Sequence, residues 1–264
     1  MSSKKKKTQA MNKSKKKAAK TATVGRSKTK TVKHLNRTKS TRSIPNPVGV
    51  IEPHPAVKVN NLPYELFNVI THSIGIGLSV AGLTALLFLS HKTQDLTMTV
   101  SIFVYGITMI ILYAASVLYH STFDPVRKLK LKRFDHIAIF IFIAGSYTPF
   151  LAKWFRDTVG YSMLAAVWGA AGAGIIMKVM NIRLKNFLNA LPYLVMGWML
   201  LFIIKPSVER VPLGCLYLYL GGGIAYSAGV YFYVRNEKYN HGIWHLFVLL
   251  GSILHFAGIL NYAV

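Results

Sequence analysis

The chain is poor in cysteine and in acidic residues. Cys215 is the one cysteine among 264 residues, so the chain can form no internal disulfide and has no cysteine-based zinc motif. Only 8 residues are Asp or Glu, against 32 Lys and Arg, and the formal net charge is +24. We also expect no signal peptide, because the first 60 residues contain no apolar core. In contrast, 52% of the residues are hydrophobic, and most of them come in long blocks.

Residues 1–42 lack both acidic and aromatic residues, yet hold 16 of the Lys and Arg residues. Such a segment cannot bury enough apolar surface to fold, and we predict a disordered tail. It can stay solvated and set the topology, or lie on anionic cytoplasmic lipid headgroups. Organelle targeting is less favoured because the segment shows no Arg-rich amphipathic period. No nucleic-acid partner is expected of a membrane protein.

The rest of the chain predicts an all-α, seven-transmembrane-helix bundle. Residues 43–63 contain five prolines and form a predicted linker, and the membrane domain is expected at 64–264. Within it lie seven apolar stretches, each close to the ~20 residues that a helix needs to cross hydrocarbon. They are 65–90, 98–122, 135–153, 160–180, 187–204, 213–234 and 242–262. We therefore expect a multi-pass protein of the plasma membrane or an endomembrane.

Loop charge predicts the orientation of this bundle. If the basic tail is cytoplasmic, the inside loops are 123–134, 181–186 and 235–241, and the outside loops are 91–97, 154–159 and 205–212. The inside loops carry nine basic residues: Arg127, Lys128, Lys130, Lys132, Arg133, Arg183, Lys185, Arg235 and Lys238. The outside loops carry four: Lys92, Arg156, Lys205 and Arg210. The prediction is a cytoplasmic N-terminus and an external C-terminus.

Histidines enter the predicted membrane region at its cytoplasmic side. His241 and His245 are four residues apart and share one face of the last helix. Ser116 and His120 have the same spacing at the end of the second helix. Asp135 begins the third helix, where capping is an alternative role for it. Buried imidazoles are costly without partners, and the alternatives for a pair such as His241 and His245 are capping, a backbone bond or a metal ion.

Taken together, three histidines and an acid from three helices reach one membrane level. Three nitrogen ligands with an open fourth position are typical of a catalytic zinc, which lowers the pKa of its bound water to about 7. His120, His241 and His245 are the candidate ligands. Asp135 is then placed to orient or deprotonate the water, and Ser116 to hold a substrate carbonyl or its oxyanion.

The first helix adds three polar residues on one face, Glu65, Asn68 and His72. They are candidates for partners that orient the metal ligands, and an interfacial polar patch is the alternative. His255 lies ten residues past His245, about 15 Å deeper by helical rise. It cannot share the same metal ion, and we expect it to be hydrogen-bonded inside the bundle.

Four ordered segments resemble the hemolysin III family, which is related to the progestin and adipoQ receptors and more distantly to alkaline ceramidases. The resemblance covers 64–264, apart from a Ser at 146 where the family has Gly, and the basic tail has no counterpart in short bacterial members. The matching segments run from Glu65 to Gly75, Ala115 to Ser121, Arg133 to Phe150 and His241 to Gly251.

The resemblance implies an intramembrane zinc near the cytoplasmic face, held by His120, His241 and His245, with Ser116 and Asp135 beside the metal-bound water. AdipoQ-type relatives look like lipid amidases acting on ceramide, whereas the family name comes from a haemolytic, pore-like activity. Two hypotheses follow. The first is a zinc-dependent hydrolase of a lipid amide or ester, with membrane lipids as substrates. The second is a pore, cytolysin or membrane-state receptor with a structural zinc.

Overall fold

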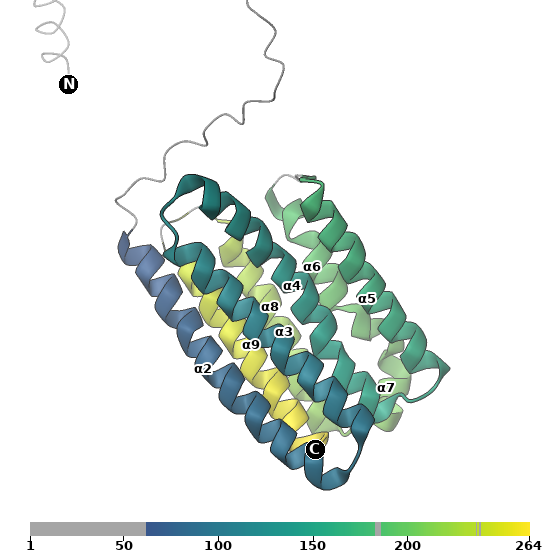
Figure 1. The fold of residues 1–264 in the computed structure, drawn as a ribbon. Helices are drawn as coiled ribbons and strands as arrows, with labels where there is room; N and C mark the ends of the chain where they lie inside the picture. Colours follow the sequence, from purple (N-terminus) through teal and green to yellow (C-terminus); the bar gives the residue numbers. More distant parts are fainter. Residues whose placement is uncertain (1–61, 183–185, 236, 238) are drawn as a thin grey trace, which may run out of the picture. The chain divides into compact units, whose positions relative to one another are not determined.

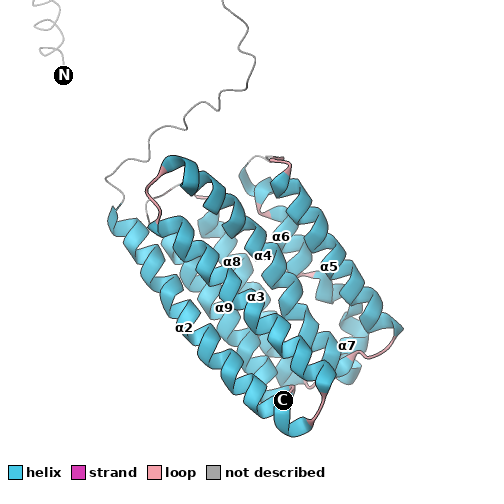
Figure 2. Cartoon of the chain, in the orientation of Figure 1, coloured by secondary structure: helices cyan, strands magenta, loops and turns pink. Residues whose placement is uncertain are grey.

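The computed structural model describes residues 62–182, 186–235, 237 and 239–264, and this part of the chain contains helices and no strand (Figure 2). The predicted tail, most of the linker, and Arg183, Lys185 and Lys238 lie outside the described residues. Seven helical segments are long and apolar enough to cross a membrane. They are α2 (Leu62–Thr93), α3 (Leu96–Ser121), α4 (Pro125–Trp154), α5 (Thr158–Val179), the interrupted span Leu191–Arg210, α8 (Leu213–Tyr233) and α9 (Asn240–Tyr262).

The third span begins ten residues earlier than the sequence analysis predicted. Basic residues that were expected in a loop at 123–134 lie instead on the first turns of α4. The start is fixed by Asp124, whose side chain accepts a hydrogen bond from the Arg127 backbone N–H, and by Pro125 at the first helical position. Lys, Arg and Leu, which follow, are good helix formers, so charge alone did not mark a loop here.

The helices pack side by side, mostly with their neighbours in sequence (Figure 1). α3 lies between α2 and α4, α5 packs on α4, and α8 packs on α9, which also contacts α2. Glycine permits the close approach of α2 to α3, because a Cβ on Gly75 would lie 2.6 Å from the Tyr113 ring. This arrangement brings α2, α3, α4 and α9, which carry the predicted site residues, into one part of the bundle.

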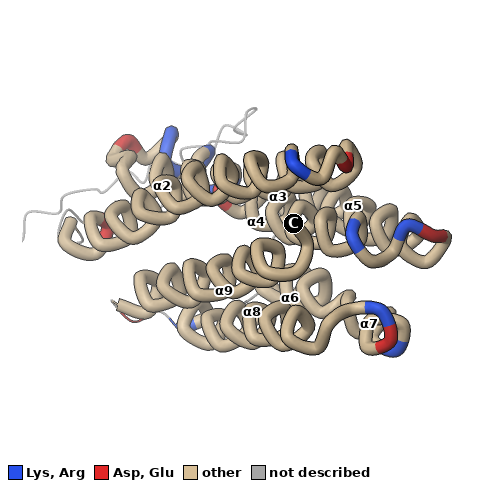
Figure 3. The backbone as a smooth tube through the Cα atoms, turned by 90° about the horizontal axis from the view of Figure 1, so that it is seen from below, with Lys and Arg blue, Asp and Glu red and all other residues tan. Residues whose placement is uncertain are grey.

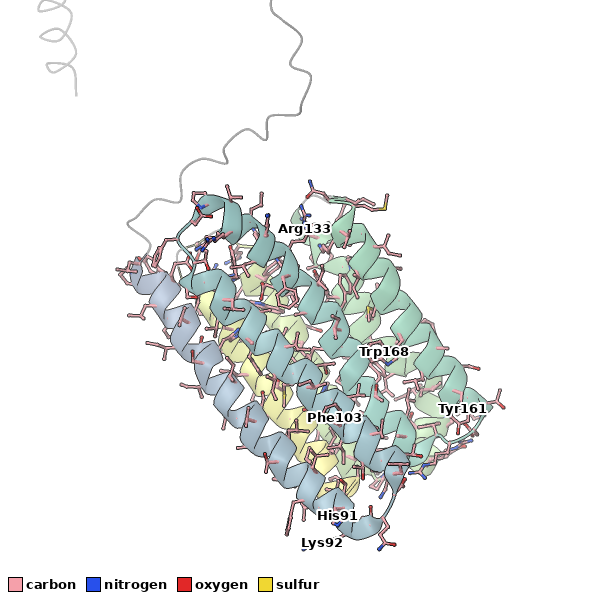
Figure 4. The ribbon with its side chains drawn as sticks, in the orientation of Figure 1. His91, Lys92, Phe103, Arg133, Tyr161 and Trp168 are labelled. Carbon is pink, nitrogen blue, oxygen red and sulfur yellow. The ribbon has the colours of Figure 1, made fainter. Side chains whose placement is uncertain are left out.

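The outside of the bundle is apolar between two charged ends. Lys, Arg, Asp and Glu gather near the helix ends, and the lengths between them carry few charges (Figure 3). His91 and Lys92 lie at one end and Arg133 at the other, while Phe103 and Trp168 lie on the outer surface between them (Figure 4). Exposed apolar side chains along seven long helices are what a surface in contact with lipid requires.

Two ion pairs tie neighbouring segments together at the end of the bundle that carries Lys92. Arg156 pairs with Asp95, and the Arg210 guanidinium lies 2.5 Å from Asp157. The hydrogen bond from Arg156 holds the pKa of Asp95 below its usual value, and Arg210 does the same for the pKa of Asp157. Any stability from these pairs is therefore present above the usual Asp pKa and is lost as the pH falls through the lowered values. Surface pairs of this kind contribute little.

The fifth span is interrupted in its middle. It consists of α6 (Leu191–Gly197), the 3₁₀ turns of η3 (Met199–Ile203) and α7 (Ile204–Arg210), and it is preceded by η2 (Asn186–Asn189). Tyr147 of α4 bonds to the backbone at this break. Its hydroxyl accepts from the Leu200 N–H at 3.0 Å and lies 2.8 Å from the Gly197 carbonyl oxygen. A side chain of a neighbouring helix thus replaces backbone bonds that the break removes.

We expect Tyr147→Phe to destabilise the protein by about 1–3 kcal/mol, because the Leu200 N–H would be left buried without an acceptor. The measurement is the thermal unfolding midpoint of the detergent-solubilised protein. Tyr161→Phe is the matched control, since Tyr161 is 62% exposed. Equal midpoints for the two variants would show that the Tyr147 hydroxyl is not needed at the break.

Candidate metal centre

Three histidines from two helices meet at one end of the bundle. His120 is in the last turn of α3, and His241 and His245 occupy successive turns at the start of α9. The Nε2 atom of His241 lies 3.1 Å from Nε2 of His120 and 3.1 Å from Nε2 of His245. One ligand atom from each of the three lies within 4.8 Å of the others. His120 and His245 are buried, and His241 is partly buried.

The chemistry of this cluster fits a bound metal ion. Two nitrogens held about 2.0–2.1 Å from a tetrahedral zinc are about 3.3 Å apart, close to the observed spacing. Hydrogen bonds alone would not satisfy the cluster. A neutral imidazole has one N–H, so His241 cannot donate well to both of its neighbours. A cation accepting all three lone pairs resolves this, and the cluster can therefore hold a metal ion.

The Glu65 carboxylate of α2 contacts His120 on the side of the ring that faces away from the other two histidines. Its Oε2 atom lies 2.5 Å from Nδ1 of His120, and the side-chain amide nitrogen of Asn68 lies 3.3 Å from the same ring nitrogen. A carboxylate at Nδ1 draws the imidazole proton to that side and leaves the Nε2 lone pair free for a metal ion. The structure thus places Glu65 where it can position a candidate ligand, whereas the Asn68 amide nitrogen, itself a donor, is a close neighbour of the protonated Nδ1 and not a second hydrogen-bond partner.

Lys128 is a component of the site that the sequence analysis did not identify. Its ammonium lies 2.7 Å from Oε1 of Glu65, and the side chain is buried on the first turns of α4. The carboxylate of Glu65 is therefore shared between His120 and Lys128. In the sequence Lys128 stands in a run of basic residues, and only the unexpected extension of α4 brings it to Glu65.

His72 lies against the second candidate ligand. Its ring stacks on that of His245 with centroids 3.7 Å apart and an interplanar angle of 17°. Both of its ring nitrogens are buried and make no hydrogen bond to the described part of the chain. The structure therefore places His72 beside the cluster as a packing partner of His245, with no hydrogen bond to a ligand.

Ser116 and Asp135 line a cavity of about 110 Å³ that reaches the histidine cluster. Ser116 is 1% exposed, and its side chain lies close enough to Asp135 to interact with the carboxyl group. Asp135, on α4, is 9% exposed and has no ion-pair partner among them. His241 and His245 line the same cavity, and most of its remaining wall is apolar. The fold thus brings together the histidine cluster, a hydroxyl group and an acid.

A bundle of seven candidate spans that encloses three clustered histidines and an apolar cavity defines a multi-pass integral membrane protein with a candidate metal centre. The family profile described as Haemolysin-III related matches residues 60–256. The chain therefore belongs to this family, as the resemblance of the four polar segments implied.

Relatives from bacteria and mammals cover most of the membrane domain. Hemolysin-3 of Bacillus cereus is 39% identical over 201 residues, which are 76% of this chain and 92% of the relative. The Hemolysin-3 homolog of Bacillus subtilis (strain 168) is 37% identical over 201 residues, 76% of this chain and 94% of the relative. The monocyte to macrophage differentiation factor of Homo sapiens is 26% identical over 205 residues, which are 74% of this chain and 82% of the relative.

Proposed function

We propose that this protein is a zinc-dependent membrane hydrolase that cleaves an amide or ester bond of a lipid. The observation that carries the proposal is the position of the histidine cluster. Two of its members, His241 and His245, line a largely apolar cavity, and Ser116 and Asp135 line the same cavity. A purely structural metal site would be closed by protein ligands and would not require a cavity beside it.

The chain's own residues divide the chemical work. A zinc ion held by His120, His241 and His245 would polarise a carbonyl group and make water a stronger nucleophile. Asp135 is the acid placed to accept a proton from the attacking water and return it to the leaving group. The Ser116 hydroxyl, which neighbours Asp135, would donate a hydrogen bond to the oxygen on which negative charge develops.

The cavity favours a lipid as the substrate. Leu112, Ile139, Phe142, Ile143 and Val248 are among its lining residues, and they suit an acyl chain better than a polar substrate. Such a wall also excludes bulk water, which strengthens each electrostatic interaction at the reacting carbonyl. We therefore expect an acyl lipid, of which ceramide is one example, to place its carbonyl at the cluster and its chain along the apolar wall.

A non-enzymatic role is the second candidate, because the Bacillus cereus relative carries the name Hemolysin-3. In that case the metal ion would stabilise a pore, a cytolysin or a receptor and would take no part in catalysis. The two candidates differ in what Ser116 and Asp135 are needed for.

The experiment that separates the candidates uses the purified full chain in liposomes made with ceramide and other acyl lipids. Fatty-acid release and leakage of an encapsulated dye are measured on the same vesicles. Release by the parent protein supports the hydrolase. The hydrolase hypothesis would be excluded if the protein caused leakage but hydrolysed none of the lipids tested. Leakage that is unchanged in Asp135→Asn would then support a pore.

We also propose that the end carrying the histidine cluster is cytoplasmic and that Val264 is external. The described basic residues at the cluster end support this: Arg127, Lys128, Lys130, Lys132, Arg133, Lys178 and Arg235.

On the cytoplasmic side the basic tail would meet anionic lipid headgroups. We expect a peptide of residues 1–42 to bind vesicles that contain anionic lipid, to dissociate from them as the salt concentration rises, and not to bind neutral vesicles.

Cysteine labelling tests the orientation. Cys215 is buried, so single cysteines introduced at exposed positions report with little background. In sealed cells, we expect an impermeant thiol reagent to label Lys92→Cys and to spare Lys130→Cys until the cells are opened. A reporter fused after Val264 should be external. The reverse labelling pattern would overturn the proposed orientation.

A further inference from the structure

The cavity has a second polar region, on α8 and α9, far from the metal cluster. Tyr219 of α8 and His255 of α9 both line it, and their rings stack with centroids 4.8 Å apart. These two helices pack along their lengths (Figure 1). The Tyr219 hydroxyl and Nδ1 of His255 are buried and make no hydrogen bond to the described part of the chain. Buried polar atoms of native proteins almost always have a hydrogen-bond partner, so we infer that a bound ligand supplies one to these two atoms.

The hydrogen bond at the other ring nitrogen shows what kind of partner His255 needs. Nε2 of His255 lies 3.1 Å from the backbone carbonyl oxygen of Tyr219, which can only accept. The imidazole proton therefore sits on Nε2, and Nδ1 presents a lone pair that requires a donor. The Tyr219 hydroxyl can donate. An aliphatic hydroxyl group gives a proton to one atom and takes one from the other, whereas a ketone could serve only Tyr219.

A neighbouring network of tyrosines shows how a hydroxyl in this part of the bundle is satisfied when its partner belongs to the chain. Ser252 donates to the Val248 carbonyl at 3.0 Å, and its oxygen lies 2.8 Å from the Tyr113 hydroxyl and 3.0 Å from the Tyr226 hydroxyl. Both lone pairs and the proton of Ser252 are thereby used. Tyr226 also lines the cavity, so it is a tyrosine in the same wall whose hydroxyl already has its partner.

The distance between the two polar regions suits one amphiphilic molecule. His245 and His255 are ten residues apart on α9, which is about 15 Å along the helix axis. An extended acyl chain covers that length with roughly a dozen carbons. Between the two regions the wall is formed by residues such as Phe142 and Val248. A ligand with its carbonyl at the histidine cluster would thus present the middle of its chain to Tyr219 and His255.

We propose that Tyr219 and His255 form a specificity subsite for a hydroxyl group in the middle of an acyl chain. The preferred substrates are then amides or esters of mid-chain hydroxy fatty acids. This inference rests on the proposed function, because the metal end of the cavity fixes where the acyl carbonyl lies. It goes beyond that function by naming the chemical group that the chain must carry and the residues that select it.

The test measures binding, so that it does not depend on turnover. Octadecanoic acid and its 2-, 6-, 10-, 12- and 16-hydroxy derivatives are titrated into the detergent-solubilised, zinc-loaded full chain, and affinity is measured by calorimetry. We expect the 10- or 12-hydroxy acid to bind about tenfold more tightly than the unsubstituted acid, and the 2-hydroxy acid to show no such gain.

Three variants assign the gain to particular atoms. Tyr219→Phe and His255→Phe keep an aromatic ring at each position, and each should remove most of the tenfold preference. Tyr226→Phe, whose hydroxyl is already bonded to Ser252, should retain the preference. The result is read as the ratio of two affinities within each variant, so a general loss of stability does not imitate it.

Several results would overturn the subsite. Equal affinity of the parent protein for all six acids would do so, and so would a preference that survives both Tyr219→Phe and His255→Phe. Absence of binding by any of the acids would count equally against it. Failure of the proposed function would look different: the 10- or 12-hydroxy acid would bind with the expected preference, and no amide or ester of it would be hydrolysed.

Discussion

Alanine in place of His120, His241 or His245 is expected to leave the purified protein without zinc, whereas the parent chain should carry about one ion per molecule. Each histidine supplies one of the three ligand atoms that lie within 4.8 Å of one another, so each substitution leaves two of them. The measurement is elemental analysis of the detergent-solubilised protein after gel filtration. Because a structural zinc would also be lost, this result tests the site and leaves the reaction open.

Two further variants show how much residues outside the three candidate ligands contribute to zinc binding. His255→Ala should keep full zinc content, because His255 lies ten residues beyond His245 and bonds to Tyr219 instead. Glu65→Gln should keep the metal with about 10- to 100-fold lower affinity, as is usual when the partner behind a ligating histidine is weakened. Full zinc occupancy in His120→Ala, His241→Ala or His245→Ala would remove that residue from the ligand set.

Asp135→Asn is expected to keep zinc and fold while lowering lipid hydrolysis by about 10²–10⁴-fold, the usual cost of losing a general base. Asparagine has nearly the same shape as aspartate but cannot take up the proton of the attacking water. The measurement is fatty-acid release from acyl lipids in liposomes, alongside zinc content and the unfolding midpoint of the same preparation.

Ser116→Ala is the companion variant for Asp135→Asn. It removes one hydrogen bond to the developing negative charge, so the expected loss of turnover is smaller than for Asp135→Asn. If both variants hydrolyse lipid as fast as the parent protein, neither residue takes part in the reaction.

Much of the fold could be predicted because the membrane imposes a simple pattern. Seven apolar stretches correspond to seven helical spans, and most predicted ends lie within a few residues of the observed ones. The histidine cluster was also predictable. A spacing of four places His241 and His245 on one helix face, and alternation of helix direction brings His120 to the same end of the bundle.

The features that sequence reasoning missed depend on contacts between helices. Lys128 reaches Glu65 only because a helix cap at Asp124 starts α4 early, so that residues expected in a loop turn inward. Likewise, nothing in the run 191–210 marks its 3₁₀ segment, since Tyr147, which bonds to the break, lies on another span. Hydropathy reports which segments lie in lipid. It does not report which polar atoms meet inside the bundle.

The interrupted fifth span has a consequence for how the protein is made. At the break the Leu200 N–H and the Gly197 carbonyl bond to Tyr147 of another span, so residues 191–210 depend on α4 to satisfy their backbone in the bilayer. Tyr147 emerges from the ribosome earlier, on α4, and its hydroxyl can already be in the membrane when Gly197 and Leu200 arrive. The order of the spans along the chain thus allows an earlier helix to supply the hydrogen-bond partner that the backbone of a later span needs during insertion.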